Sequence, residues 1–258
     1  MTAQAAPQHN IDIRMCHTLE DCEACVAMEK HIWQTDDIEL VPSAVIRVVA
    51  KTGGQVIGGF EGHRMIGFTF ALPAFRTVEN RVVPFLHSHM TAVLPEYQNH
   101  GIGRRLKLFQ RNEALARGIR LIEWTFDPFE LRNAYFNVMR LGAVMRRYIP
   151  NFYGITTSPL HSGIPTDRLV AEWHLDSPRV CAAAEGKRPP APASDAVRVS
   201  LPGDIGERKH REPSEAIAIQ ESIRADFQRH FDAGLAVTGI ETAGHETHYV
   251  LEPWKEPS

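Results

Sequence analysis

The sequence predicts a mixed α/β sheet for most of the chain, followed by a small extension. Short apolar runs with a period of two indicate strands, and between them the apolar period lengthens to about 3.6, which indicates helices. These runs do not repeat as βαβ units, so the sheet is expected to be mixed. The length of 258 residues, with 43% hydrophobic and 23% charged residues, is that of an ordinary globular protein.

The first elements lead up to a glycine-containing loop near residue 100. Pro42 opens the second helix, and Glu61-Gly62-His63 separates the two runs of a hairpin. The predicted elements are, in order, a strand at 11–15, helices at 19–33 and 42–51, hairpin strands at 55–60 and 65–72, and a strand at 82–93.

The remaining elements divide the chain into three parts. After the loop we expect a helix at 102–118, with a basic face of Arg104, Lys107 and Arg111, then a strand at 119–126, a helix at 131–141, and strands at 145–154 and 168–175. These complete a domain of residues 1–184. A Pro- and Ala-rich linker follows at 185–195. Residues 196–258 are predicted to form a small βαββ appendage, with a strand at 197–201, a helix at 214–233, and strands at 236–242 and 247–251.

Composition argues against several functional classes. The net charge of −3 gives no general attraction to nucleic acid or anionic membranes, and no apolar run approaches the length of a membrane span. The N-terminus has no charged-then-apolar leader. Four cysteines are too few for a disulfide scaffold, and the Cys22-x-x-Cys25 pair has no second Cys or His pair to complete a metal site. We therefore expect no metal and a reducing, cytoplasmic setting.

The segment from His87 to Leu106 carries the clearest chemistry. A strand leads into a loop containing Gly101 and Gly103, and the loop opens directly into a long helix. Free backbone N–H groups at a helix start form a socket for phosphate. The glycines allow close approach of the anion, and Arg104 adds a positive charge. Glycines on the way into a core helix are the simpler alternative, but the full pattern is much more restrictive.

That pattern, Val-x-Pro-x-Tyr-Gln-x-x-Gly-x-Gly-x-x-Leu, resembles the acyl-CoA pyrophosphate loop of the GNAT N-acetyltransferase superfamily. The resemblance covers about residues 11–175 and implies a GNAT-like fold with acetyl-CoA, or another acyl-CoA, as co-substrate. It also implies that the strand before the loop pairs with pantetheine and diverges from the next strand. The implied cofactor-binding residues are Thr91, Ala92, Val93, Gln98, Asn99, His100, Gly101, Ile102, Gly103, Arg104 and, in a helix motif further along, Asn133.

His87 and His89 are the candidate catalytic base. They lie on one strand face, and serotonin-type arylalkylamine acetyltransferases are similar in having a His-x-His pair at the matching positions, where it relays a proton from the amine. An ammonium must lose a proton before it attacks, and imidazole has a suitable pKa near neutrality. The alternative is that both rings only make hydrogen bonds in the interior.

One position departs from the resemblance. The family usually has a tyrosine four residues before the glycine that ends the helix motif, where it protonates the departing thiolate, but this chain has Val138. Tyr135, Tyr148 or Tyr153 could substitute, and we take Tyr148 as the candidate. Water is a further alternative, because a thiolate is a tolerable leaving group.

The sequence thus predicts an enzyme that moves an acetyl or other small acyl group from acyl-CoA to the amine of a small molecule by direct attack. One alternative is succinyl transfer to an amino acid. Another is a CoA-binding regulatory module without turnover. The pattern leaves open the acceptor, the choice between monomer and homodimer, and the role of residues 185–258.

Overall fold

Ten strands form one continuous sheet in the order β1-β2-β3-β4-β5-β7-β6-β9-β10-β8. The computed structural model describes residues 10–34, 39–154 and 163–255. Neighbouring strands are antiparallel except β4 and β5, which are parallel. The strands are β1 (Ile11–Met15), β2 (Gln55–Glu61), β3 (Arg64–Val78), β4 (Arg81–Val93), β5 (Leu121–Phe126), β6 (Val144–Ile149), β7 (Arg168–His174), β8 (Val197–Pro202), β9 (Leu235–Ala243) and β10 (Glu246–Pro253).

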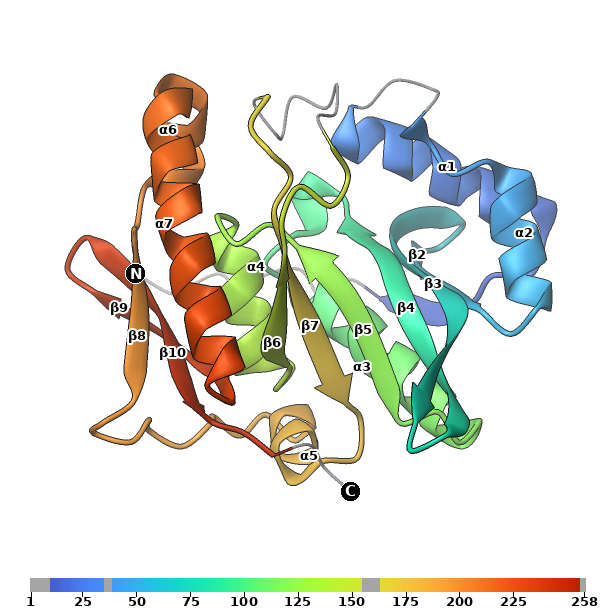
Figure 1. Ribbon diagram of the computed structural model, residues 1–258. Coiled ribbons are helices and arrows are strands. Elements are labelled where there is room, and N and C mark those ends of the chain that lie inside the picture. Colours follow the sequence, from blue (N-terminus) through green and yellow to red (C-terminus); the bar gives the residue numbers. More distant parts are fainter. Residues whose placement is uncertain (1–9, 35–38, 155–162, 256–258) are drawn as a thin grey trace, which may run out of the picture.

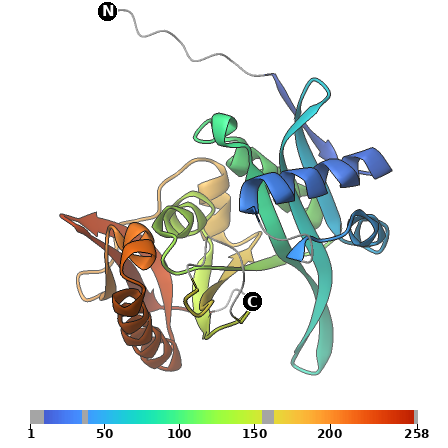
Figure 2. The ribbon, with the colours of Figure 1, turned by 90° about the horizontal axis from the view of Figure 1, so that it is seen from above.

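Helices cover both faces of the sheet. On the front face in Figure 1, α1 and α2 pack on β2 and β3 at one side, and α7 packs on β6, β8 and β9 at the other. Helix α3 lies behind the sheet, and the view from above shows the same separation (Figure 2). The helices are α1 (Leu19–Trp33), α2 (Ser43–Lys51), α3 (Ile102–Ala116), α4 (Leu131–Tyr135), α5 (Pro178–Ala184), α6 (Ile205–Arg211) and α7 (Pro213–Asp232).

The mixed sheet confirms the predicted fold class, and the predicted strands and long helices occur in the predicted order. The sequence analysis did not predict α5 and α6, which have only seven residues each. Helices of this length are marginal on their own and depend on tertiary contacts. The strand predicted at 65–72 is longer, Arg64–Val78, and forms a second hairpin with β4 that was not predicted. The helix predicted at 131–141 is α4 followed by a π-helical turn, Phe136–Arg140.

The C-terminal extension (residues 196–258) shares a hydrophobic core with β5, β6 and β7. Phe227 of α7 is fully buried and stacks on Tyr148 of β6, with ring centroids 5.7 Å apart. Arg224 of the same helix forms an ion pair of 2.8 Å with the buried Asp167. By contrast, among the described residues β9 meets β6 through one register pair, Met145 with Val237. Side-chain packing, more than strand pairing, therefore joins the extension to the rest of the sheet.

Three further expectations can be compared with the described residues. No described helix is both long enough and apolar enough to cross a membrane. Cys16, Cys22 and Cys25 are buried free thiols, the last two on α1 itself. The described part of the chain contains no cluster of three His, Cys, Asp or Glu side chains that could hold a metal ion.

Candidate active site

The strands β4 and β5 meet at only two positions and then diverge. Their register pairs are Leu86 with Ile122 and His87 with Glu123. Past His87, toward the loop that leads to α3, no described residue of β4 has a partner on β5. The backbone groups on this edge of β4 are therefore left for another partner, because buried N–H and C=O groups need hydrogen bonds. This is the divergence that the sequence analysis expected.

A β-bulge places His89 at the point of divergence. Phe70 of β3 pairs with Met90, and the next residue, Ala71, pairs with Ser88, so His89 is the extra residue on β4. Bulges bend a strand and redirect its side chains, and they are frequent next to active sites. The rings of His87 and His89 lie 6.3 Å apart between centroids, at an angle of 42°. The ring of His89 also meets the edge of Phe70.

The surroundings of both histidines favour neutral imidazole. Burial lowers the pKa of His87 to about 4, and the charges of His89, Arg147 and Lys107 act in the same direction. Burial also lowers the pKa of His89. A neutral imidazole can accept a proton, whereas an imidazolium cannot. The pair is thus present as a base at neutral pH, although the pKa of His87 lies well below the value near neutrality that the sequence suggests.

The loop before α3 exposes the start of that helix. Gly101 is the N-cap residue in the left-handed region (φ 77°), and no side-chain hydrogen bond from the described residues caps α3. A Cβ added at Gly103 would meet only the Cγ2 of Val93, at 3.9 Å. The first N–H groups of α3 therefore face open space beside the end of β4. This arrangement can bind an anion through backbone donors and the helix dipole.

Comparison with known proteins identifies this arrangement. Residues 13–136 match the sequence model of the acetyltransferase (GNAT) family. This stretch has the sequence pattern of the GNAT-type acetyltransferases. The structure of NAA60 from Arabidopsis thaliana with acetyl-CoA is similar with a TM-score of 0.54 and 14% identity, covering 65% of this chain and 100% of that one. The putative acetyltransferase yncA from Salmonella typhimurium with acetyl-CoA has a TM-score of 0.51 and 18% identity, covering 72% and 99%.

Both likenesses show the fold of the GNAT-type domain, since nearly the whole of each of those chains superposes on part of this one. No curated protein sequence matches the chain. The family match confirms the predicted superfamily and the predicted enzyme class, an acyl-CoA-dependent N-acyltransferase. It ends at residue 136 and so leaves out the C-terminal extension.

The structure gives the side-chain surroundings of three residues that the sequence analysis assigned to the cofactor. The guanidinium of Arg104 donates to the backbone oxygens of Ala183 and Ala184, at 2.7 and 2.9 Å, and so holds the end of α5. The side-chain amide of Gln98 donates to the Val93 oxygen at 3.0 Å. Asn133 is an exposed residue of α4. The side chain of Arg104 is thus engaged in the fold, so an anion at the start of α3 would be held by backbone donors.

Tyr148 does not lie at the divergence of β4 and β5. It is on β6, its hydroxyl donates to Asp167 at 2.8 Å, and burial together with Asp167 raises its pKa far above the ordinary value. This arrangement argues against Tyr148 as a proton donor. Tyr153 and Tyr135, the two alternatives, are both 44% exposed. The hydroxyl of Tyr153 lies 3.1 Å from the Thr125 hydroxyl of β5, whereas Tyr135 is on α4. Val138 is fully buried.

The sequence analysis missed the burial of Lys107. It placed this residue on a basic face of the helix with Arg104 and Arg111. Lys107 is 4% exposed. Its Nζ donates to the hydroxyl of Ser88, between the two histidines on β4, at 3.1 Å, and lies 4.1 Å from the centre of the Trp124 ring. Burial lowers the pKa of Lys107 to about 7. Helical periodicity cannot reveal this burial, because it depends on the sheet against which the helix packs.

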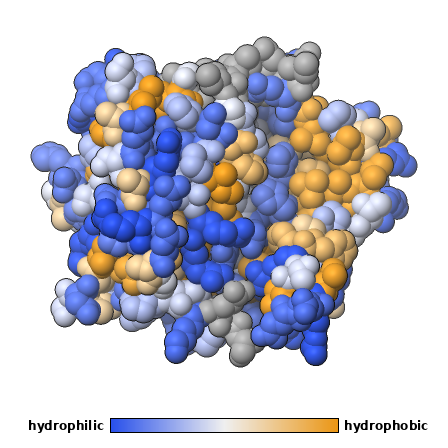
Figure 3. All heavy atoms as spheres, viewed as in Figure 1, coloured by the Kyte–Doolittle hydropathy of each residue, from blue (hydrophilic) through white to orange (hydrophobic). Residues whose placement is uncertain are grey.

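Apolar side chains form the outer edge of the front face. Phe75 and Val82 of the β3–β4 hairpin are each 69% exposed, and Val48 of α2 is 59% exposed. Figure 3 shows apolar surface gathered on this side of the molecule, over α2 and the hairpin. In Figure 1, no described helix lies in front of β5 and β7 between this edge and α7. The described helices therefore leave this part of the sheet uncovered.

Proposed function

We propose that this protein transfers an acetyl group from acetyl-CoA to the amine of a small molecule that binds on the front face of the sheet. The divergence of β4 and β5 immediately past His87 carries the proposal. It leaves a strand edge for the pantetheine amides and brings the thioester beside the histidine pair. The start of α3 would hold the pyrophosphate.

The reaction is a direct attack of the amine on the thioester carbonyl. His87 or His89 accepts the proton that the ammonium loses, and the free amine then attacks, so no covalent enzyme intermediate is needed. The nitrogen of the tetrahedral adduct loses its second proton to solvent or to the departing thiolate. Backbone N–H groups of β4 near Val93 stabilise the oxyanion as charge develops on the carbonyl oxygen. The carbon–sulfur bond then breaks, and the thiolate of CoA leaves with or without a proton from the protein.

Incubation with a panel of small primary amines and acetyl-CoA tests this function. We expect mass spectrometry to detect an acetylated amine and an equal amount of free CoA, each dependent on the folded protein. Succinyl-CoA serves as the second donor, because the near alternative transfers succinyl to an amino acid. If CoA binds tightly but neither donor is consumed with any amine, the protein is a CoA-binding regulatory module, and the proposal is wrong.

Tyr153 is the tyrosine best placed to protonate the leaving thiolate, because its hydroxyl contacts Thr125 on β5. We expect Tyr153→Phe to lower kcat by about 10²-fold, the low end of general acid catalysis, because a thiolate leaves readily even without a proton. The KM for acetyl-CoA should change little. Steady-state kinetics at saturating amine measures both values. Tyr135→Phe is the matched control, and a larger loss in the control would transfer the role to Tyr135.

A further inference from the structure

The bulge in β4 brings the residues that flank it to the same face of the sheet. Ser88 pairs with Ala71 of β3, and Thr91 pairs with Thr69. Paired residues of adjacent strands point to the same side, and so do residues two apart on one strand. Ser88 and Thr91 are three residues apart, yet they point to the same side because His89 is an extra residue between them.

The same face carries a network of buried polar side chains between the sheet and α3. Lys107 and Gln110 are three residues apart and therefore lie on one side of α3. The Nζ of Lys107 donates to the Ser88 hydroxyl at 3.1 Å and to the Oε1 of Gln110 at 2.6 Å. The Nε2 of Gln110 donates to the Thr69 hydroxyl at 3.4 Å, and that hydroxyl donates to the Met90 backbone oxygen at 3.1 Å. The network thus holds β4 directly before and directly after the bulged residue.

Lys107 also stands behind the point where β4 and β5 diverge. The last register pair of these strands is His87 with Glu123, so Ser88 and Trp124 are the first residues past it. The Nζ of Lys107 meets both of them, at 3.1 Å from the Ser88 hydroxyl and 4.1 Å from the centre of the Trp124 ring. An amine cation over the face of a tryptophan ring is attracted to it. The head of Lys107 therefore links the two strands at the position where their register pairing ends.

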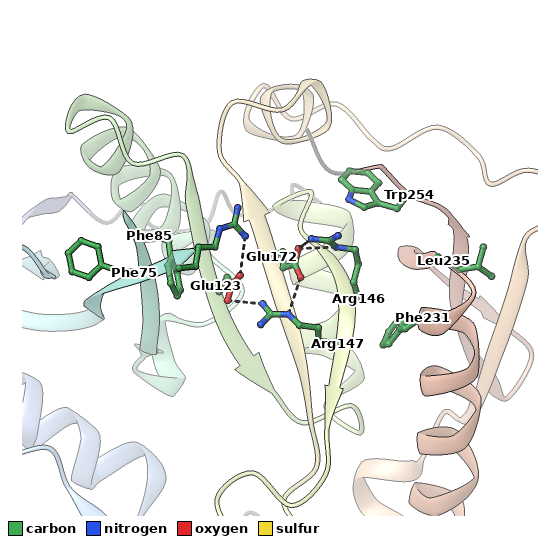
Figure 4. A pocket seen from close by; sticks show the side chains of 11 residues that line it. Phe75, Phe85, Glu123, Arg146, Arg147, Glu172, Phe231, Leu235 and Trp254 are labelled. Carbon is green, nitrogen blue, oxygen red and sulfur yellow. Dashed lines mark hydrogen bonds and ion pairs between the residues drawn. The ribbon is translucent and has the colours of Figure 1, made fainter. Parts of the chain in front are cut away.

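On the front of the sheet, the ion pairs near the same point connect β5 with other strands. Glu123 binds Arg147 of β6 at 2.7 Å, and Arg147 also binds Glu172 of β7 at 3.2 Å, as Figure 4 shows. These contacts fix β5 against β6 and β7. The contact that Lys107 makes from behind instead fixes β5 against β4, the strand that carries the candidate base.

The polar head of Lys107 supplies something that an apolar core residue lacks. Taking an ammonium out of water is costly, and burial accordingly lowers the pKa of Lys107 to about 7. A methionine of similar length would fill this space without that cost. It would offer no hydrogen bond to Ser88, and no charge to the Trp124 ring or to the Trp173 ring, 5.3 Å away. The contact with β4 is therefore what a lysine contributes at this position.

We propose that Lys107 is a positioning residue for the candidate base, because it holds the bulged part of β4 from behind and so fixes the direction of the His87 and His89 rings. Its contact, Ser88, lies between the two histidines in the chain. His87 is the neighbour of Ser88 on the strand and points to the opposite side. Lys107 thus acts through the backbone of β4 and does not touch the substrate. The inference rests on the proposed acyl transfer for the task that the two rings perform.

Nuclear magnetic resonance of the histidine rings tests this contact without any turnover. The ring signals of His87 and His89 are assigned by their loss in the corresponding glutamine variants. We expect Lys107→Met to shift or broaden these signals, because β4 loses its anchor behind the sheet. Ser88→Ala is the smallest change that removes the same contact from the other side, and it should have the same effect.

Arg111→Met is the matched control. Arg111 is on the same helix and donates to the Leu175 backbone oxygen at 2.7 Å, so its loss removes a contact of α3 that does not reach β4. The variant should leave the ring signals of both histidines unchanged, even where it lowers the melting temperature as much as Lys107→Met does.

Steady-state kinetics with acetyl-CoA and an accepted amine tests the consequence for catalysis. Lys107→Met and Ser88→Ala should each lower kcat by about 10–10²-fold, because a displacement of about 1 Å in a catalytic group can cost that much. The KM for acetyl-CoA should stay near the wild-type value, since neither variant changes the start of α3. The double variant should lose no more than the larger single loss, because the two changes break one contact. Arg111→Met should keep the wild-type kcat.

The outcomes separate this inference from the proposed function. A wild-type kcat in a folded Lys107→Met or Ser88→Ala variant overturns the positioning role, while acyl transfer by the wild type stands. An equal loss of kcat in Arg111→Met overturns it too, because the cause would then be a general loosening of α3. If the wild type acetylates no amine, but the ring signals move in the first two variants and not in the control, the acyl transfer fails and the anchor of β4 stands.

Discussion

Replacing both His87 and His89 by glutamine should lower kcat/KM for amine acetylation by about 10²–10⁴-fold, the usual worth of general base catalysis. The affinity for acetyl-CoA should not change, because only side chains of β4 are replaced. The proposed cofactor contacts are made by the backbone of β4 and by the start of α3. Each single variant should lose less, since the neighbouring ring, 6.3 Å away, can still take the proton directly or through water. Steady-state kinetics and calorimetry with acetyl-CoA provide the two measurements.

The pH dependence of this loss follows from the burial of His87. Its base form is the neutral ring, and the pKa is lowered to about 4. The ring is therefore neutral above about pH 4 and becomes protonated as the pH falls through that value. The ratio of wild-type to double-variant kcat/KM should stay constant from about pH 6 to 8 and shrink toward one only at acidic pH. Taking this ratio removes the titration of the acceptor amine itself. Because the two rings interact, the pH at which this ratio falls describes the histidine pair and not one ring alone.

A matched control exists in the C-terminal hairpin. His245 and His248 lie three residues apart there, and His248 contacts the Ser200 hydroxyl at 2.7 Å. The double replacement of His245 and His248 by glutamine should leave kcat/KM unchanged.

A folded His87→Gln/His89→Gln variant with the wild-type rate would leave His87 and His89 a purely structural role. A step in the ratio at about pH 6.5, the ordinary pKa of histidine, would instead show that burial in solution is weaker than the structure indicates.

Gly103→Val should raise the Kd for acetyl-CoA by about 10²–10⁴-fold without unfolding the protein. The added Cβ has room, since it meets only Val93 at 3.9 Å, but its methyl groups would fill the space beside the first N–H groups of α3. Losing two hydrogen bonds to a charged phosphate costs about 3–6 kcal/mol, which corresponds to that range of Kd. Calorimetric titration with acetyl-CoA measures it, and circular dichroism verifies the fold.

Gly206→Val is the matched control for this change. Gly206 is the second residue of α6, as Gly103 is of α3, and an added Cβ there meets only the Phe129 oxygen, at 3.8 Å. The same propensity cost therefore applies to both helices, but α6 has no proposed phosphate site. We expect wild-type affinity in Gly206→Val. Wild-type affinity in a folded Gly103→Val as well would show that the start of α3 does not bind the pyrophosphate.

Local patterns were sufficient to predict the elements that carry the cofactor loop. The periodicity of α1 gave its observed bounds, Leu19–Trp33, and the change of period after Gly101 placed the start of α3 at Ile102. The spacing of the two histidines on β4 predicted that their rings are close together. The rings are close in the structure, where His89 is the extra residue of a β-bulge. The bulge itself has no sequence pattern that reveals it, because it exists only relative to the pairing with β3.

The sequence by itself determined the order of helices and strands along the chain, the glycine-containing loop at the start of α3 and the candidate base on β4. Each of these depends on residues that are close together in the chain. Only the tertiary structure decided the environment of these groups. The low pKa of His87, the burial of Lys107 and the engagement of Arg104 with α5 all arise from residues far away in sequence. The same holds for a cavity of about 430 Å³ whose lining includes Arg76 of β3, Arg147 of β6 and Trp254 of the C-terminal extension. Desolvation and charge pairing act through space, so local periodicity carries no information about them.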